Sequence, residues 1–90
     1  MSAIVKGTVA RDPELRYTPS GYALATWSVF PEGGVEPVRC VAWRELGERL
    51  CEQLRQGTLV NLWGYEKTRE WDGKTTTEFV VTRADYREPA

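Results

Sequence analysis

The chain has 90 residues, of which 12 are Lys or Arg and 13 are Asp or Glu, and its formal net charge is −1. A chain of this length forms one domain, and its charge excludes a global positive field, so any nucleic-acid binding must rest on a local basic patch. The sequence contains no His, and Cys40 and Cys51 fit no CxxC or zinc spacing, so we expect no metal, no other cofactor and no catalytic residues. No apolar run approaches the roughly 20 residues of a membrane span, and residues 1–10 lack a signal-peptide core, so we expect a cytoplasmic protein.

The first half of the chain predicts three strands. Residues 2–10 (SAIVKGTVA) alternate loosely and predict a strand, and residues 11–21 (RDPELRYTPSG) predict a structured turn because they hold two prolines and a closing glycine. Residues 22–30 (YALATWSVF) predict a second strand whose core face carries Ala23, Ala25, Trp27 and Val29. After a short loop (PEGGVEP), residues 38–43 (VRCVAW) predict a third strand, with Val38, Cys40 and Ala42 on one face and Arg39, Val41 and Trp43 on the other.

The second half predicts one helix and two longer strands. Leu46, Leu50 and Leu54 recur at helical spacing within RELGERLCEQLRQG, and Gly57 is the residue type usually found just past a helix end. Residues 58–71 and 74–86 then predict two strands joined by Asp72-Gly73. Five strands with one short helix between the third and the fourth indicate an all-β fold, a closed or nearly closed barrel with the helix at one end.

The Asp72-Gly73 pair predicts a tight hairpin that fixes the register of the two long strands. Asp-Gly between alternating runs favours a turn with positive φ at both central residues. Trp71 should then pair with Lys74, Arg69 with Thr76 and Lys67 with Glu78. One face of the first strand carries Trp63, Tyr65, Lys67, Arg69 and Trp71, while the carboxylates Glu66 and Glu70 fall on the other.

This aromatic and basic face suits single-stranded nucleic acid, because aromatic rings stack on bases without regard to sequence while Lys and Arg neutralise phosphates. Trp71, at a hairpin tip, and Trp43, at a strand end before Arg44, are the favoured ring contacts. For Trp63 and Tyr65 a subunit interface and a ligand contact both stay open, since Gly64 can mark a bulge that changes their direction. Lys67 and Arg69 have an alternative interpretation as a solvated edge paired with Glu78. Arg11 and Arg16 also have an alternative interpretation, as parts of a structural turn, because Asp12 and Glu14 accompany them.

The segments GTVARDPELRYTPSGYALATWSV, VAWRELGERLCEQLRQGTLVNLWG and KTREWDGKTTTEFVV together resemble the bacterial single-stranded DNA-binding protein family, over residues 4–84. The resemblance implies an OB fold, sequence-tolerant and non-enzymatic binding of single-stranded DNA in replication, recombination or repair, a place at the nucleoid, and a homo-oligomer, with a tetramer favoured and a dimer possible. Trp71 matches the family's stacking tryptophan, Trp43 stands where the family has a stacking phenylalanine, and Arg39, Lys67 and Arg69 fall on basic positions near the DNA path.

The sequence departs from the family pattern at three places, and the first two, the short loop and Glu70, predict a weaker or smaller footprint. The loop PEGGVEP is short and lacks the further stacking tryptophans, so Phe30 stands near positions where it cannot do the same work. Glu70 replaces a basic residue beside Trp71. The chain also stops at YREPA, where family members usually continue into a flexible linker and an acidic tip, so we expect a short form that does not recruit repair or replication enzymes through such a tail; a cloned domain would look the same.

The candidates for base stacking are thus Trp43, Trp71, Trp63, Tyr65 and Phe30, and those for phosphate contact are Arg39, Lys67, Arg69, Arg44, Lys74, Arg11 and Arg16. The alternative is an OB-fold replication adapter that resembles primosomal replication protein N and acts mainly through protein contacts. The short loop, the missing tail and the slightly acidic charge balance favour the adapter. The Trp71 hairpin and the position of Trp43 favour single-stranded DNA binding, which we prefer.

Overall fold

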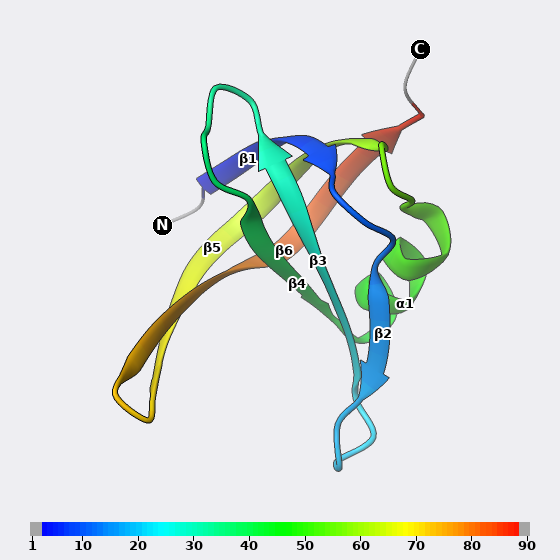
Figure 1. The fold of residues 1–90 in the computed structure, drawn as a ribbon. Helices are drawn as coiled ribbons and strands as arrows, with labels where there is room; N and C mark the ends of the chain where they lie inside the picture. The colour runs from blue at the N-terminus through cyan, green and yellow to red at the C-terminus, as the bar shows by residue number, and fades with distance from the viewer. Residues whose placement is uncertain (1–2, 89–90) are drawn as a thin grey trace.

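The computed structural model describes residues 3–88, and of Trp71 it describes the backbone alone. Six strands and one helix follow one another along the chain (Figure 1). In order they are β1 (Ala3–Val9), β2 (Glu14–Tyr17), β3 (Ala23–Pro31), β4 (Val38–Trp43), α1 (Arg44–Gln53), β5 (Leu59–Trp71) and β6 (Lys74–Arg87).

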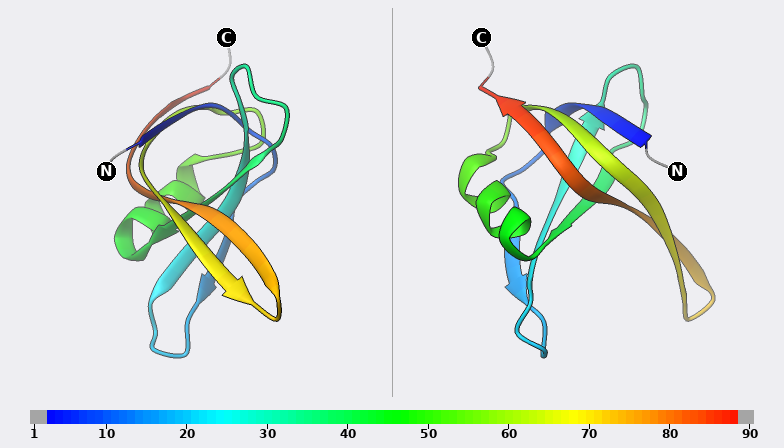
Figure 2. Two further views of the ribbon diagram at one scale, coloured as in Figure 1. Left: turned by 90° about the vertical axis from the view of Figure 1, so that its left-hand side faces the viewer. Right: turned by 180° about the vertical axis from the view of Figure 1, so that it is seen from behind.

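The strands form one sheet that closes on itself. The sheet order is β1-β5-β6-β4-β3-β2, and a further pairing of β1 with β3 completes a ring of five strands, to which β2 adds a short sixth. All pairings are antiparallel except that of β4 with β6, which is parallel. The left view of Figure 2 shows the strands curving around the interior, with α1 at one side. The predicted all-β fold with one short helix is confirmed.

The prediction of five strands was wrong by one, because the segment read as a turn contains β2. Its residues pair antiparallel with β3, from Glu14 opposite Thr26 to Tyr17 opposite Ala23. The Thr18 backbone N–H donates to the Tyr22 carbonyl oxygen, with a distance of 2.9 Å from nitrogen to oxygen, and Gly21 adopts a φ of +87° in the turn. All four residues of β2 are exposed, so no burial pattern marks this strand in the sequence.

The core fills the ring from the faces that the alternation predicted. The predicted core residues of β3 are all buried, and Trp27 is only 5% exposed. Leu50 and Leu54 close one end of the core from α1 and the residue that follows it, and both are fully buried. Gly47 lets α1 approach β4, because a Cβ at this position would lie 2.5 Å from the Ala42 carbonyl oxygen.

The helix is shorter than the sequence predicted. α1 ends at Gln53, and Leu54, its C-cap, is already extended with φ −83° and ψ 141°. Gly57 lies three residues further on, in a separate turn, with a φ of +92°. Its N–H donates to the Val9 carbonyl at 2.8 Å. Within residues 3–88 no helix is long and apolar enough to cross a membrane.

Burial of Cys40 makes the stability of the fold depend on pH. Cys40 is fully buried on β4, and this burial raises the pKa of its thiol from 9.0 to about 12. A folded-state pKa above the unfolded value means that the contribution to stability is complete below pH 9.0 and is lost as the pH rises toward 12, because the unfolded chain then releases the proton more readily. We expect urea unfolding to show a larger loss of stability from pH 7 to about pH 10 for the native chain than for Cys40→Ala. Equal losses in the two proteins would contradict this prediction.

Candidate nucleic-acid interface

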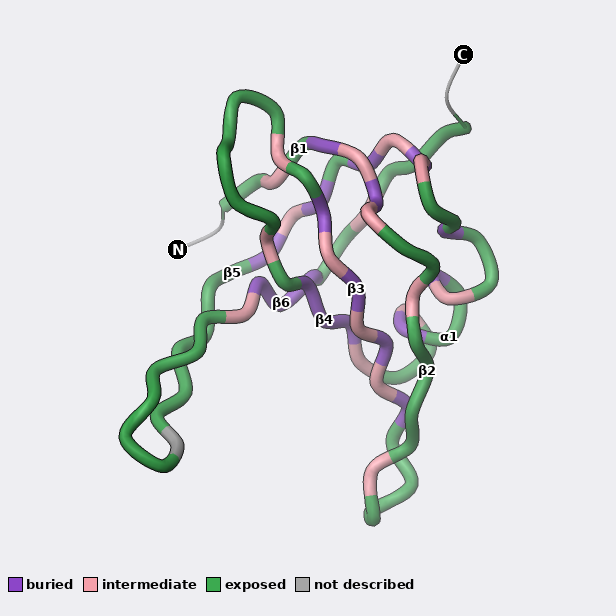
Figure 3. The backbone as a smooth tube through the Cα atoms, in the orientation of Figure 1, coloured by how far each residue is buried: buried purple, intermediate pink, exposed green. Residues whose placement is uncertain are grey.

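β5 and β6 continue beyond the ring as a long two-stranded arm with the predicted register. Asp72 and Gly73 form its tip with φ values of +51° and +76°, as a tight turn of this type requires. Lys67 lies opposite Glu78, Arg69 opposite Thr76 and Trp71 opposite Lys74, so the predicted pairing is confirmed. Figure 3 shows the arm as exposed along its outer half.

The predicted bulge lies on β6 and leaves the alternation of β5 unchanged. Trp63 pairs with Arg83 and Gly64 with Val81, so Thr82 is the additional residue, and its hydroxyl donates to the Trp63 carbonyl at 3.2 Å. Leu62 and Gly64 are buried on the inner face. Tyr65 is 46% exposed and shares the outer face with Lys67 and Arg69. Trp71 occupies the next position of this face in the register, and its side chain lies outside the described residues.

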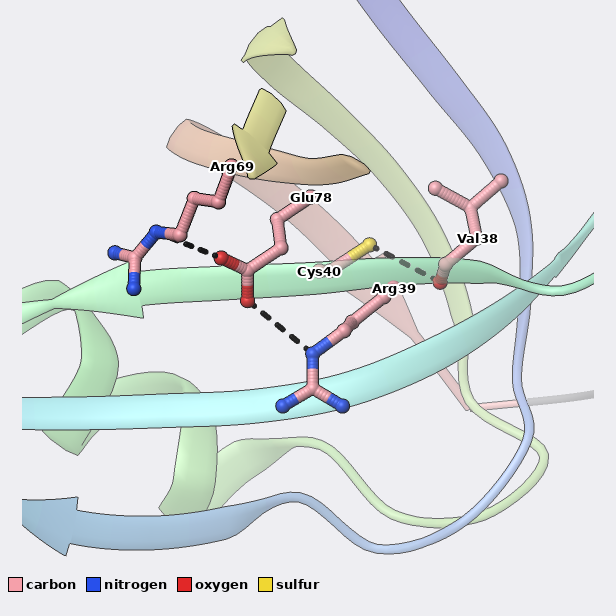
Figure 4. Close-up of polar contacts among 5 residues, drawn as sticks. All are labelled: Val38, Arg39, Cys40, Arg69 and Glu78. Carbon is pink, nitrogen blue, oxygen red and sulfur yellow. Dashed lines mark hydrogen bonds and ion pairs between the residues drawn. The ribbon is translucent and has the colours of Figure 1, made fainter. Parts of the chain in front are cut away.

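Glu78 holds two of the predicted phosphate-binding arginines at the base of the arm. Arg39 of β4 donates through Nε to one carboxylate oxygen of Glu78 at 3.2 Å, and Nε of Arg69 lies 3.5 Å from the other oxygen (Figure 4). The sequence placed Lys67 opposite Glu78, and its alternative interpretation paired both Lys67 and Arg69 with that carboxylate. Lys67 does face Glu78 in the register, but in the described part of the chain the ion pairs of Glu78 are made with the two arginines.

Trp43 ends β4 and Arg44 begins α1, so both lie at the end of β4 away from the loop that joins β3 to β4. Trp43 is half-buried and pairs with Leu24 of β3. It shares one face of β4 with Arg39, which is exposed, and with Val41, which is buried although the sequence placed it on the non-core face. Arg44 begins α1 with a φ of +61°, and its guanidinium lies 4.6 Å from the ring centre of Tyr22. The positive φ is strained for a side chain other than glycine, and the cation–π contact holds the exposed Arg44 against Tyr22.

Trp63 forms a second aromatic and cationic contact on β5, on the side of Tyr65 that lies away from the arm. It is half-buried, pairs with Ile4 of β1, and stacks against Arg83, whose guanidinium lies 4.9 Å from the ring centre. Ile4 is 46% exposed beside it. The sequence analysis missed Arg83 as the partner of Trp63, because the register predicted from Asp72-Gly73 reaches Arg83 only across the bulge, and it also missed Tyr22 as the partner of Arg44.

A groove of about 580 Å³ runs along the outer face of β3, and it includes Arg39 and three more of the predicted residues. Phe30, Arg11, Arg16 and Arg39 line it. Two neighbours limit its positive charge: Glu14 forms an ion pair with Arg16 at 3.2 Å, and Asp12 accepts a hydrogen bond from the Gln56 backbone at 2.8 Å. Phe30 is 56% exposed at this site. Lys74 is also exposed, at the arm tip. Among residues 3–88 no group of His, Cys, Asp or Glu is arranged to hold a metal ion.

Comparison with known proteins identifies the family and the fold of the chain. The model of the single-strand binding protein family matches residues 1–87. The chain belongs to this family. A solved structure of the SSB domain of a Synechococcus protein superposes with a TM-score of 0.80 at 28% identity, and the match covers 92% of this chain and 91% of that one. The expected OB fold is therefore confirmed.

Curated relatives in the family carry the same description. The chain is 34% identical to single-stranded DNA-binding protein 3 of Listeria innocua over 88% of its own length and 55% of that protein. It is 33% identical to the single-stranded DNA-binding protein of Oceanobacillus iheyensis over 94% of its own length and 62% of that protein. The chain thus spans little more than half the length of these relatives.

Proposed function

We propose that the chain binds single-stranded DNA with little regard to base sequence and protects exposed strands during replication, recombination or repair. The observation that carries this proposal is the sorting of the arm: Tyr65, Lys67 and Arg69 share its outer face, while Glu66 and Glu70 alternate with them. Membership of the single-strand binding protein family supports the same function.

Base stacking and phosphate neutralisation together make up the proposed mechanism. Trp43 and Trp71 stack on bases, each with about 1–3 kcal/mol of binding free energy. Arg39, Lys67 and Arg69 neutralise phosphates along the strand between these rings. The remaining candidates extend the path at its margins: Phe30, Arg11 and Arg16 along the groove, Arg44 beside Trp43, and Lys74 at the arm tip. Duplex DNA cannot use the aromatic rings in this way, because its base faces are stacked within the helix.

The proposal is for a binding protein that catalyses no reaction and acts in the cytoplasm on nucleoid DNA. It includes a homo-oligomer, with a tetramer favoured over a dimer. The outer surface around Ile4 and Trp63 supports self-association, because exposed apolar side chains on paired strands bury area when two copies meet. In that arrangement Trp63 and Tyr65 contribute to the subunit interface and to the margin of the DNA path.

Fluorescence anisotropy of a labelled thymidine oligonucleotide, with the matching duplex as control, tests the proposal. We expect tight binding to the single strand and weak binding to the duplex. The logarithm of the single-strand association constant should fall linearly with the logarithm of salt concentration, with a slope of about −2 for three neutralised phosphates. Equal affinity for the duplex, or an affinity that does not change with salt, would contradict the proposed function.

A further inference from the structure

The Glu78 carboxylate is the most enclosed charged group of the proposed DNA path. Its side chain is 12% exposed, whereas those of Arg39 and Arg69 are 56% and 54% exposed. The three residues come from β6, β4 and β5, so the contact joins the ring of strands to the base of the arm. A negative charge at this position is unexpected on a surface that binds a polyanion, since it repels phosphate.

The geometry of the two ion pairs resolves this conflict. Both arginines contact Glu78 through Nε, the nitrogen nearest the side-chain stem. Figure 4 shows the two terminal nitrogens of each guanidinium pointing away from the carboxylate. Within the part of the chain that the structure describes, these terminal nitrogens make no hydrogen bond or ion pair. A guanidinium binds phosphate in a bidentate manner through two such nitrogens, so both arginines keep a pair of donors available.

We propose that Glu78 is a positioning residue for DNA binding, which orients Arg39 and Arg69 so that their terminal nitrogens receive the phosphodiester groups of a bound strand. This inference rests on the proposed function, and it adds to the DNA-binding surface a negatively charged residue where positive charge is expected. Each arginine side chain held in advance loses less rotational freedom on binding, which strengthens binding by about two- to tenfold per side chain. The carboxylate also fixes where the arm meets β4, and with it the spacing of the two arginines.

Glu78→Gln tests the inference, because it keeps the size of the side chain and removes its charge. A simple charge argument predicts tighter binding, since the variant is less negative. Positioning predicts weaker binding, by about three- to tenfold, because the amide nitrogen that replaces one carboxylate oxygen is a donor and cannot accept from the second Nε. Glu66→Gln is the matched control: it removes the same charge from the arm on the face that does not carry the arginines, and its affinity should stay equal to or slightly above that of the native chain.

A second pair of proteins separates positioning from a general effect on the fold. In the background Arg39→Gln with Arg69→Gln, Glu78 has no arginine to orient and only repels phosphate. Adding Glu78→Gln to that background should therefore tighten binding, so the sign of its effect should reverse. Thermal unfolding of each variant shows that the compared proteins are folded.

Three outcomes would overturn the inference while leaving the proposed function in place: tighter binding by Glu78→Gln, unchanged binding, or the same loss in both backgrounds. A native chain that binds no single strand would overturn the proposed function, and the inference with it.

Discussion

Gly64→Ala is expected to lower the stability of the fold by about 3 kcal/mol, which corresponds to a fall in melting temperature of about 12–24 °C for a domain of this size. Gly64 lies on the inner face of β5, directly beside the bulge of β6. A Cβ at this position would overlap the Val80 carbonyl oxygen and lie 2.8 Å from the carbonyl carbon. The obstacle is backbone that pairs with β4 and β5, so it cannot move aside as a flexible side chain can.

Gly21→Ala is the matched control for this prediction. Gly21 has open space around the position of a Cβ, but a φ of +87°, so alanine there meets backbone strain without a clash. We expect a cost of about 1 kcal/mol. Thermal unfolding followed by circular dichroism measures both variants. Similar melting temperatures for the two variants would show that the close approach at Gly64 does not limit the fold.

Trp71→Ala is expected to weaken single-strand binding by roughly 5- to 150-fold, the equivalent of about 1–3 kcal/mol for one stacked base. The expectation rests on the backbone position of Trp71 beside the Asp72-Gly73 turn and on the outer-face register it shares with Lys67 and Arg69. The residues next to it at the arm tip are exposed, so the ring of strands and its core do not depend on this position. We therefore expect no change in melting temperature.

Anisotropy titrations of the variant, beside Tyr86→Ala as control, measure this effect. Tyr86 is an exposed aromatic residue near the end of β6, opposite Val60 and far along the strand from the arm tip. Its replacement should leave affinity unchanged. If Trp71→Ala lowers the melting temperature instead of the affinity, then Trp71 serves the fold and the stacking role is wrong.

Local patterns in the sequence predicted much of the fold. The Asp72-Gly73 pair determines a turn geometry, and turn geometry determines register, so the pairing of the eight residues 64–71 of β5 with β6 followed from two residues, whereas beyond the bulge the pairing is shifted by one. The alternation of β3 likewise separated the buried Trp27 from the outer face, because a half-buried strand repeats every two residues. Both predictions needed only contacts between neighbours along the chain.

The parts that the sequence did not reveal depend on long-range contacts or on exposed residues. β2 was missed because all of its residues are exposed, which leaves no hydrophobic alternation to mark it. The contact of Glu78 with Arg39 was missed because it depends on the parallel pairing of β4 with β6, in which Cys40 lies opposite Phe79. No local spacing predicts which strand closes a ring. The two cation–π contacts were missed for other reasons. The contact of Trp63 with Arg83 lies across the bulge of β6, and that of Arg44 with Tyr22 depends on the pairing of β3 with β4, in which Leu24 lies opposite Trp43.

The central claim is that aromatic rings on the outer face stack on the bases of a single strand. A titration of intrinsic tryptophan fluorescence with a poly-thymidine single strand, at low and moderate salt, tests it most directly. Trp27 is buried and should contribute a constant signal, so quenching reports on the remaining tryptophans. We predict strong quenching by the single strand, none by the matching duplex, and an affinity that falls as salt rises. No quenching at micromolar strand would contradict the claim, and the aromatic surface would then be better explained as the protein interface of a replication adapter.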